Sequence, residues 1–285
     1  MGIISNKINQ LEESATLAMT KLSRELKAQG KDVINLSIGE PDFNTPDFIK
    51  ESAKIALDDN YTHYTPVPGY LDLREMVVHK LKRDNQVDYS ASQIVVSTGA
   101  KQSISNVFVS ILNPGDEVII PAPYWVSYAD MVKLAEGVPS IIKTDIANDF
   151  KVTAQEIKQA ITSKTKAIIF SSPCNPTGTV YSKEELKSLA QILKDHPEII
   201  IISDEIYEHI NFDSQHESIA QFPEVKDQVV IINGVSKGFA MTGWRLGFMA
   251  APQEIANACI KYQGQTTSGT NSIAQKAAMK AFEIN

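Results

Sequence analysis

The stretch Val229-Val-Ile-Ile-Asn-Gly-Val-Ser-Lys-Gly-Phe-Ala-Met-Thr-Gly-Trp-Arg-Leu-Gly-Phe248 contains two apolar runs on either side of a polar turn bounded by glycines. The runs at 229–232 and 246–250 predict two buried strands. Too few residues separate these strands for a full helical crossover. The second strand is therefore expected to run antiparallel to the first.

The turn between these two runs displays Ser236 and Lys237, and Arg245 follows it directly before the second run. A lysine amine near a hydroxyl and a guanidinium suits covalent bonding to a carbonyl compound that carries a phosphate. A single lysine after a strand is more often a solvated charge, so the turn alone leaves both interpretations open.

Short β-branched runs alternate with helical periodicity through the chain from residue 93 onward. Strands are expected at 94–97, 117–120, 139–143, 167–170, 199–202, 229–232 and 246–250, and helices at 101–112, 126–135, 154–161 and 183–193. Such alternation is typical of a mostly parallel sheet with helices on both faces. The sequence therefore predicts an α/β fold with a mostly parallel seven-stranded sheet and one antiparallel strand.

The two ends of the chain add further expected elements. They are a helix over 14–30 that ends at Gly30, a strand over 33–38, a loop through Gly39 and Pro46, a helix over 46–57 capped by Thr45, and helices over 70–85 and 269–285. Gly30 suits the left-handed position after a helix, and Pro46 suits the first helical position.

Composition excludes several functional classes. The 285 residues are 43% hydrophobic and 21% charged, which is an ordinary globular composition for one large domain or one and a half. A net charge of -7 and a pI near 5.3 give no basic surface for nucleic acid or anionic lipid, which favours small-molecule chemistry. Cys174 and Cys259 form neither a disulfide framework nor a metal cluster, so no metal site is expected.

The same features predict a cytoplasmic protein, because the first residues lack the apolar segment of a signal peptide and no apolar run reaches the ~20 residues of a membrane helix. The motifs of two nucleotide-binding classes are also absent. The only Gly-Lys pair, Gly30-Lys31, follows a helix rather than a strand, and no two glycines stand two apart. A P-loop nucleotidase and a dinucleotide oxidoreductase are therefore disfavoured.

Ligands of such sheets bind beyond the carboxyl ends of the strands. The groups expected there match the needs of pyridoxal phosphate, which are an amine for a Schiff base, a carboxylate for the pyridine nitrogen, donors for the 3′ oxygen, an aromatic face and a phosphate cup. The residues that would meet these needs, in that order, are Lys237; Asp204; Asn175 with Tyr207; Trp125; and Gly99, Ala100 and Lys101 with Ser236 and Arg245.

On these residues and their order, the sequence resembles the class I pyridoxal-phosphate-dependent aminotransferases of fold type I, in particular the bacterial aspartate aminotransferase subgroup. The matching segments are Ile38-Gly-Glu-Pro-Asp-Phe43, Tyr64 with Pro68-Gly69, Gly99-Ala-Lys-Gln102, Pro123-Tyr-Trp-Val-Ser-Tyr128, Asn175-Pro-Thr-Gly178, Ser203-Asp-Glu-Ile-Tyr207, and Ser236-Lys237 with Gly243-Trp-Arg245. Each segment alone is weak, whereas all of them in the order of the family are specific.

The resemblance implies a role for each residue. Lys237 would bond the cofactor, Asp204 would pair with the pyridine nitrogen, and Tyr207 and Asn175 would hold the 3′ oxygen. Trp125 would stack on the ring, and Gly99, Ala100, Lys101, Ser236 and Arg245 would surround the phosphate. Tyr64 would reach the phosphate of a partner subunit in a homodimer. Gly39, Trp125 and Asn175 would contact the substrate. Lys237, Asp204 and Tyr207 are the expected catalytic residues.

The chain also departs from the pattern of the family. In the family, a C-terminal part joins the first segment to build a small domain and supplies an arginine that binds the substrate α-carboxylate. None of Arg24, Arg74, Arg83 or Arg245 matches that arginine. The expected organisation is an N-terminal segment over 1–45 that contributes to an incomplete small domain, and a large cofactor-binding domain over 46–285. The chain is expected to be a fragment.

The resemblance predicts transfer of an amino group from an amino acid, with aspartate the preferred donor, to a 2-oxo acid, with 2-oxoglutarate the preferred acceptor. Two alternatives remain open at this point. The first is a pyridoxal-phosphate lyase or synthase on the same fold, which would share the cofactor residues. The second is a cofactor-binding fragment without turnover.

Overall fold

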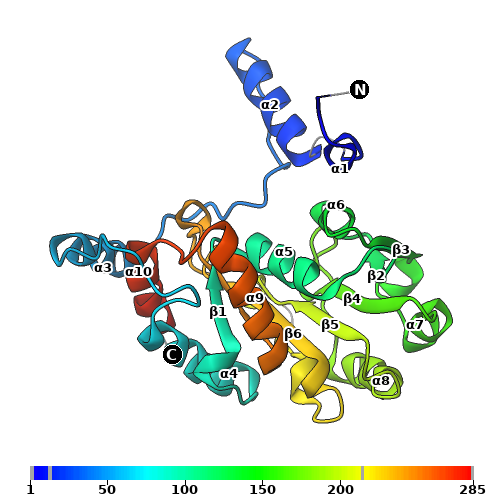
Figure 1. Ribbon diagram of the computed structural model, residues 1–285. Helices are drawn as coiled ribbons and strands as arrows, with labels where there is room; N and C mark the ends of the chain where they lie inside the picture. The colour runs from blue at the N-terminus through cyan, green and yellow to red at the C-terminus, as the bar shows by residue number, and fades with distance from the viewer. Residues whose placement is uncertain (1–2, 12–14, 213–214, 284–285) are drawn as a thin grey trace.

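A seven-stranded sheet forms the centre of the computed structural model, which describes residues 3–11, 15–212 and 215–283 (Figure 1). The strands are β1 (Ile94–Ser97), β2 (Glu117–Ala122), β3 (Val138–Lys143), β4 (Thr165–Ser171), β5 (Ile200–Asp204), β6 (Val229–Gly234) and β7 (Gly247–Ala250), in the order β1-β7-β6-β5-β4-β2-β3. Strand β7 is antiparallel to both of its neighbours, and the other pairs are parallel. The seven predicted strands of the sheet and its single antiparallel strand are confirmed.

Helices cover both faces of this sheet, as predicted. One face carries α5 (Ala100–Ile111), α6 (Ser127–Leu134) and α9 (Gln253–Thr266). The other face carries α4 (Leu71–Asn85), α7 (Ala154–Ala160), α8 (Lys183–Leu193) and α10 (Ser272–Phe282), and α3 (Asp47–Asp58) packs on α10. Short 3-10 turns complete the fold at Ala91–Gln93, Ile146–Asn148, Ile219–Gln221, Lys226–Gln228 and Thr242–Trp244.

The apolar composition of the central strands follows from this coverage. In β6, Val229 and Ile231 belong to one core, and Val230 and Ile232 belong to the core on the opposite face. Successive side chains of a strand point to opposite faces, so a strand covered on both sides must be apolar throughout. Continuous apolar runs therefore identified the strands of this chain.

The N-terminal segment lies apart from the sheet (Figure 1). It contains α1 (Asn6–Asn9) and α2 (Ala15–Ala28), and Gly30, at φ +78°, follows the end of α2 as predicted. The expected helix start at residue 14 lies outside the described residues. The predicted strand over 33–38 is wrong, because this segment pairs with no strand, and Ile34 and Leu36 are 84% and 89% exposed.

Thr45 does not cap α3, contrary to prediction. Pro46 stands at the cap position, and the Thr45 hydroxyl instead donates to Ala240 O at 2.6 Å and accepts from Trp244 Nε1 at 3.1 Å. These bonds join the loop before α3 to the turn after β6. The Thr45 hydroxyl therefore bonds Ala240 and Trp244 instead of the start of α3. These bonds also hold the loop that contains Gly39 near Lys237.

Helix α9 was not predicted, because part of its buried face is polar. Gln263 is fully buried and bonds Ser97 Oγ and Asn106 Nδ2 at 2.9 Å each. A face of this kind gives no continuous apolar stripe in the sequence. Among the described residues, no helix combines the length and apolar character that crossing a bilayer requires. The predicted division of the chain at residues 45 and 46 stays a prediction.

Candidate active site

Five strand ends supply the groups that the sequence singled out. Gly99 follows β1, Trp125 follows β2, Asn175 follows β4, Asp204 ends β5 and Lys237 follows β6. The parallel register sets Asp204 beside Ser171 of β4 and Ile232 of β6. All these ends meet at the carboxyl edge of the sheet, where ligands of open α/β sheets bind.

The Lys237 amine lies under the loop that contains Gly39. Its Nζ donates to Gly39 O and lies 5.6 Å from the centroid of the Tyr207 ring. A Cβ at Gly39 would lie 3.3 Å from the Tyr207 hydroxyl and 3.9 Å from Lys237 Nζ, so the loop passes closely over both groups.

Burial lowers the pKa of Lys237, and the charge of Arg245 lowers it further, whereas Glu40 and Asp204 oppose this. A lysine of this kind is deprotonated more readily than a solvated one. The neutral amine is the form that can bond a carbonyl carbon or accept a proton.

Asp204 is 4% exposed, and both of its carboxyl oxygens are hydrogen bonded. The Tyr128 hydroxyl donates to Oδ2 at 2.5 Å, and the Ile206 N–H donates to Oδ1 at 3.3 Å. Burial is the main cause that raises the pKa of Asp204 to about 6; Glu205 also raises it, and the two hydrogen bonds and Lys237 lower it. The group therefore remains ionised at neutral pH and presents a buried negative charge.

Asn175 and Tyr207 form a pair at the ends of neighbouring strands. Asn175 Nδ2 donates to the Tyr207 hydroxyl at 3.1 Å. Burial raises the pKa of Tyr207, and the bond from Asn175 moderates the effect. This pair offers an amide and a phenol beside Lys237, and both groups can donate to a ligand oxygen.

A cluster of cations lies at the start of α5. The Lys101 ammonium lies 4.7 Å from the centroid of the Trp125 ring. Burial and the charge of Arg245 lower the pKa of Lys101. Arg245 donates from Nη1 to Thr242 O at 2.8 Å. Together with the unpaired N–H groups at the start of a helix, two cations form a region suited to an anion.

Gly99 and Gly247 are required by the backbone geometry at this place. Gly99 has φ +85°, and a Cβ there would lie 2.4 Å from Arg245 Nη2. A Cβ at Gly247 would lie 2.3 Å from the Ala100 backbone nitrogen, so β7 touches the first residue of α5 directly. Side chains at either position would push the guanidinium or the helix away. Ser236 is buried in the adjoining turn, where its carbonyl accepts from Met241 N at 3.1 Å.

The structure does not bring every predicted residue to this edge. Tyr64 is fully exposed and touches none of the groups described above. Arg74 donates to Gly69 O and Ala91 O, and Arg83 pairs with Asp84. Arg24 is exposed on α2. The hydrogen bonds of Arg74 and Arg83 thus hold these two side chains away from Lys237.

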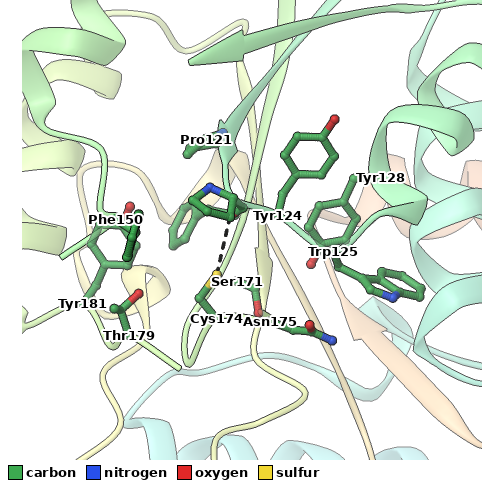
Figure 2. A pocket seen from close by; sticks show the side chains of 12 residues that line it. Pro121, Tyr124, Trp125, Tyr128, Phe150, Ser171, Cys174, Asn175, Thr179 and Tyr181 are labelled. Atoms are coloured by element: carbon green, nitrogen blue, oxygen red, sulfur yellow. Dashed lines mark hydrogen bonds between the residues drawn. The ribbon is translucent and has the colours of Figure 1, made fainter. Parts of the chain in front are cut away.

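A small pocket adjoins Trp125 and Asn175 (Figure 2). Aromatic side chains dominate its lining, which consists of Pro121, Pro123, Tyr124, Trp125, Tyr128, Phe150, Phe170, Ser171, Cys174, Asn175, Thr179 and Tyr181. The Cys174 thiol points to Pro123 O at 3.7 Å. Tyr128 and Trp125 lie side by side at one side of the pocket (Figure 2).

Sequence reasoning missed two residues that contact this edge. Tyr128 lay within a matching segment, but its spacing fits packing as well as a polar role. Glu40 accepts from Thr242 Oγ1 at 2.6 Å and raises the pKa of Lys237. Its position beside Gly39 was the available signal. Both roles depend on contacts between segments far apart in the chain.

A second polar cluster lies on the opposite face of the sheet. Glu205, Glu208 and His216 each place one potential ligand atom within 4.8 Å of the others. The buried Lys80 ammonium, however, forms an ion pair with Glu208, and His216 Nε2 lies 3.0 Å from Glu205 Oε2. Lys80 therefore supplies a cation for this cluster from within the chain.

The fold, a mixed seven-stranded sheet with helices on both faces, is that of a transferase family, as the comparison with known families shows. The family described as "Aminotransferase class I and II" matches residues 31–283. The chain belongs to this aminotransferase family.

Individual relatives carry more specific names. The chain is 49% identical over 284 residues to the probable aspartate/prephenate aminotransferase of Rickettsia bellii, with 99% of this chain and 71% of the relative covered. It is 48% identical to the aspartate aminotransferase of Bacillus sp. strain YM-2, with 98% and 72% covered. The solved structure of the Thermus thermophilus aspartate aminotransferase with maleate is 39% identical with a TM-score of 0.96, and the match covers 99% of this chain and 73% of that one.

Proposed function

We propose that this chain binds pyridoxal 5′-phosphate through Lys237 and transfers an amino group from aspartate to 2-oxoglutarate. The observation that carries the proposal is the contiguity of Lys237, the ionised Asp204 and the Asn175–Tyr207 pair at one sheet edge. Relatives named aspartate aminotransferase support the choice of substrate.

The groups of this edge suit the proposed cofactor. Asp204 would face the pyridine nitrogen, and Asn175 with Tyr207 would hold the 3′ oxygen. Trp125 offers an aromatic face. Gly99, Ala100, Lys101, Ser236 and Arg245 would hold the phosphate, because the left-handed Gly99 turn exposes backbone N–H groups beside two cations.

The chemistry of the chain then rests chiefly on Lys237. Bound pyridoxal phosphate supplies an electron sink for the bond that breaks at the substrate Cα. The substrate amine would take the place of Lys237 on the cofactor, and the lowered pKa of the released Lys237 favours the neutral amine, which would take the Cα proton of the amino acid. The Gly39 loop lies over Nζ and limits access of water to it. Gly39 would also contact the substrate, together with Trp125 and Asn175.

The proposal includes a homodimer in which Tyr64 of each subunit reaches the phosphate of the other. Full exposure of Tyr64 in the single chain supports this assignment. A cytoplasmic location is part of the same proposal.

The cofactor assignment is tested by covalent trapping. The chain is incubated with pyridoxal phosphate, reduced with borohydride and digested, and the modified peptide is identified by mass spectrometry. We expect the modification on Lys237, its loss in Lys237→Ala, and its retention in Lys143→Ala, which removes an exposed lysine at the edge of the sheet. Modification spread evenly over surface lysines would contradict the proposal.

The reaction is tested with aspartate and 2-oxoglutarate. Formation of oxaloacetate and glutamate in equal amounts supports the transferase. Release of ammonia or loss of carbon dioxide without glutamate would favour a lyase or synthase with the same cofactor residues. Specific modification of Lys237 without any product would favour a chain that binds the cofactor without turnover.

A further inference from the structure

Tyr128 lies between two groups of the proposed cofactor site. It is 1% exposed, and its hydroxyl donates to Asp204 Oδ2 at 2.5 Å. Its ring meets the Trp125 ring edge to face, with centroids 5.5 Å apart and planes at 88° (Figure 2). One side chain thus contacts both the carboxylate for the pyridine nitrogen and the aromatic face.

Local structure explains how one residue reaches both groups. Helix α6 begins at Ser127, two residues after Trp125, and the Tyr128 N–H donates to Trp125 O at 3.0 Å. Residues three apart on a helical turn lie on the same side. The turn therefore fixes the two rings relative to each other, and the phenol reaches from β2 across β4 to the end of β5.

The groups around Asp204 make the Tyr128 phenol important for the ionisation of the Asp204 carboxyl group. Among the described residues, Tyr128 is the only one whose side chain donates to the Asp204 carboxylate. Lys237 favours the ionised form and Glu205 disfavours it. Tyr207 and Cys174 are the other titratable groups nearby, from the turn after β5 and the loop after β4.

We propose that Tyr128 is a positioning residue that acts through Asp204. Its hydroxyl keeps the carboxylate ionised and oriented for the pyridine nitrogen of the cofactor, and its ring supports Trp125. This inference rests on the proposed function and adds a residue that touches neither cofactor nor substrate itself.

A role in packing alone is the competing explanation, and the chain contains a matched case for it. Tyr181 is 4% exposed and meets Phe170 edge to face at 5.5 Å. Its hydroxyl is also hydrogen bonded, but it accepts from the Val152 N–H at 2.9 Å. Tyr181→Phe therefore removes a buried, bonded tyrosine hydroxyl without changing a donor to Asp204.

The test compares the dissociation constants of pyridoxal phosphate for wild type, Tyr128→Phe and Tyr181→Phe from about pH 5.5 to about pH 8.5. The ratio of variant to wild type cancels the ionisation of the free cofactor. Removal of the donor raises the carboxyl pKa, so the protonated, weakly binding form persists to higher pH. We expect a ratio of about 5 near pH 6 that approaches 1 near pH 8.5 for Tyr128→Phe, and a flat ratio for Tyr181→Phe.

A second measurement needs no cofactor. The ¹³C signal of the Asp204 carboxyl carbon, assigned through its loss in Asp204→Asn, is titrated in wild type and Tyr128→Phe. We expect the midpoint to rise by about one pH unit in the variant. An unchanged midpoint overturns the proposal even if the variant binds cofactor poorly.

The remaining outcomes separate this inference from the proposed function. A Tyr128→Phe ratio that is large but equal at every pH shows a packing role and overturns the inference while the cofactor site stands. If wild type binds no pyridoxal phosphate at any pH, the proposed function fails, and the assignment of Tyr128 fails with it.

Discussion

The carboxyl group of Asp204 shows how a single residue can favour ligand binding and disfavour folding. Burial raises its pKa to about 6 from an ordinary value of 3.8, although two hydrogen bonds oppose the rise. The folded chain therefore holds a proton at pH values where the unfolded chain has lost it. The Asp204 carboxyl group therefore contributes most to the stability of the cofactor-free chain at low pH. This contribution is lost as the pH rises from about 4 to about 6.

Replacement of Asp204 by Asn removes the loss of stability that accompanies ionisation of the carboxyl group. The shift of about two pH units corresponds to about 3 kcal/mol. We expect the free energy of unfolding of cofactor-free wild type to fall relative to that of Asp204→Asn by about 1–3 kcal/mol between pH 4.5 and pH 7.5, measured in urea. The variant should also bind pyridoxal phosphate more weakly. A pH dependence that is identical in both proteins would contradict the buried charge.

Gly99 presents a second test at the residue scale. Gly99→Ala should displace the Arg245 guanidinium, because the new Cβ would lie 2.4 Å from Nη2, in addition to straining a left-handed backbone. We expect at least about tenfold weaker binding of pyridoxal phosphate, measured by equilibrium dialysis, since a charge-assisted bond to the phosphate is lost.

The matched control is Gly115→Ala. Gly115 also has a left-handed backbone, at φ +91°, but nothing lies within 4 Å of the added Cβ. Gly115→Ala should lose about 1 kcal/mol of stability and Gly99→Ala at least as much, but only Gly99→Ala should lose affinity for the cofactor. Equal affinities in the two variants would contradict a role for Gly99 in the phosphate site.

At the scale of elements, the end of β5 serves the two faces of the sheet differently. Asp204 lies on the face of α6 and contacts Tyr128, whereas Glu205 lies on the face of α4 near Lys80, Glu208 and His216. Consecutive residues of an extended strand alternate between faces. Adjacent carboxylates in the sequence thus belong to two separate clusters.

Lys80 is expected to be the principal stabilising cation of the cluster on the α4 face. Lys80→Met should lower the free energy of unfolding by about 3–5 kcal/mol, because it leaves the buried Glu208 charge without its lysine, and the His209 ring beside Glu208 is partly exposed. Urea denaturation measures this change.

Two further variants test that explanation. The double variant Lys80→Met with Glu208→Gln should recover much of the loss, since no unpaired charge remains. Lys54→Met, which breaks the exposed pair of Lys54 with Glu51, should leave stability unchanged within error. A Lys80→Met variant as stable as wild type would show that the ion pair does not matter for folding.

Some helices and strands of this chain could be predicted from the sequence, and others could not. The strands were predictable because burial on both faces requires continuous apolar runs, as in β6. The segment 33–38 has a similar local pattern but finds no partner strand, and a local pattern cannot show that. Gln263 in α9 and Thr45 are governed by tertiary hydrogen bonds, which local propensity does not contain.

The candidate site was predictable to a similar extent. Lys237, Asp204 and Asn175 follow strand ends, and parallel register brings strand ends together. The hydrogen bond of Tyr128 could not be predicted, because its hydroxyl donates to the Asp204 carboxylate, 76 positions away in the chain. Spacing along α6 indicates only that Tyr128 shares a side with Trp125.

At the scale of the whole molecule, the cofactor groups come from five strand ends, whereas Tyr64 remains on the exposed surface. The proposed homodimer would bring Tyr64 of one subunit to the other. Tyr64→Phe in one subunit and Lys237→Ala in the other would then alter the same site and leave the second site intact.

Hybrid dimers test this arrangement. Refolding Tyr64→Phe together with Lys237→Ala should produce hybrids in which one site carries both substitutions and the other carries neither. We expect the mixture to contain a fraction of sites with wild-type affinity for pyridoxal phosphate, detected by titration, which neither variant contains alone. Sedimentation that shows only a monomer with bound cofactor would contradict the arrangement.

The bond between Thr45 and Ala240 spans 195 positions of the chain, and this affects how the protein is made. At a synthesis rate of about 5–20 residues per second, the partner of Thr45 leaves the ribosome roughly 10–40 s after Thr45 itself. Over that interval, Thr45 has neither Ala240 nor Trp244 to bond, and the exposed side chains of Ile34 and Leu36 lie just upstream of it. We expect this N-terminal stretch to be accessible to molecular chaperones in the nascent chain, and the Gly39 loop to be fixed over Lys237 only after residue 240 has left the ribosome.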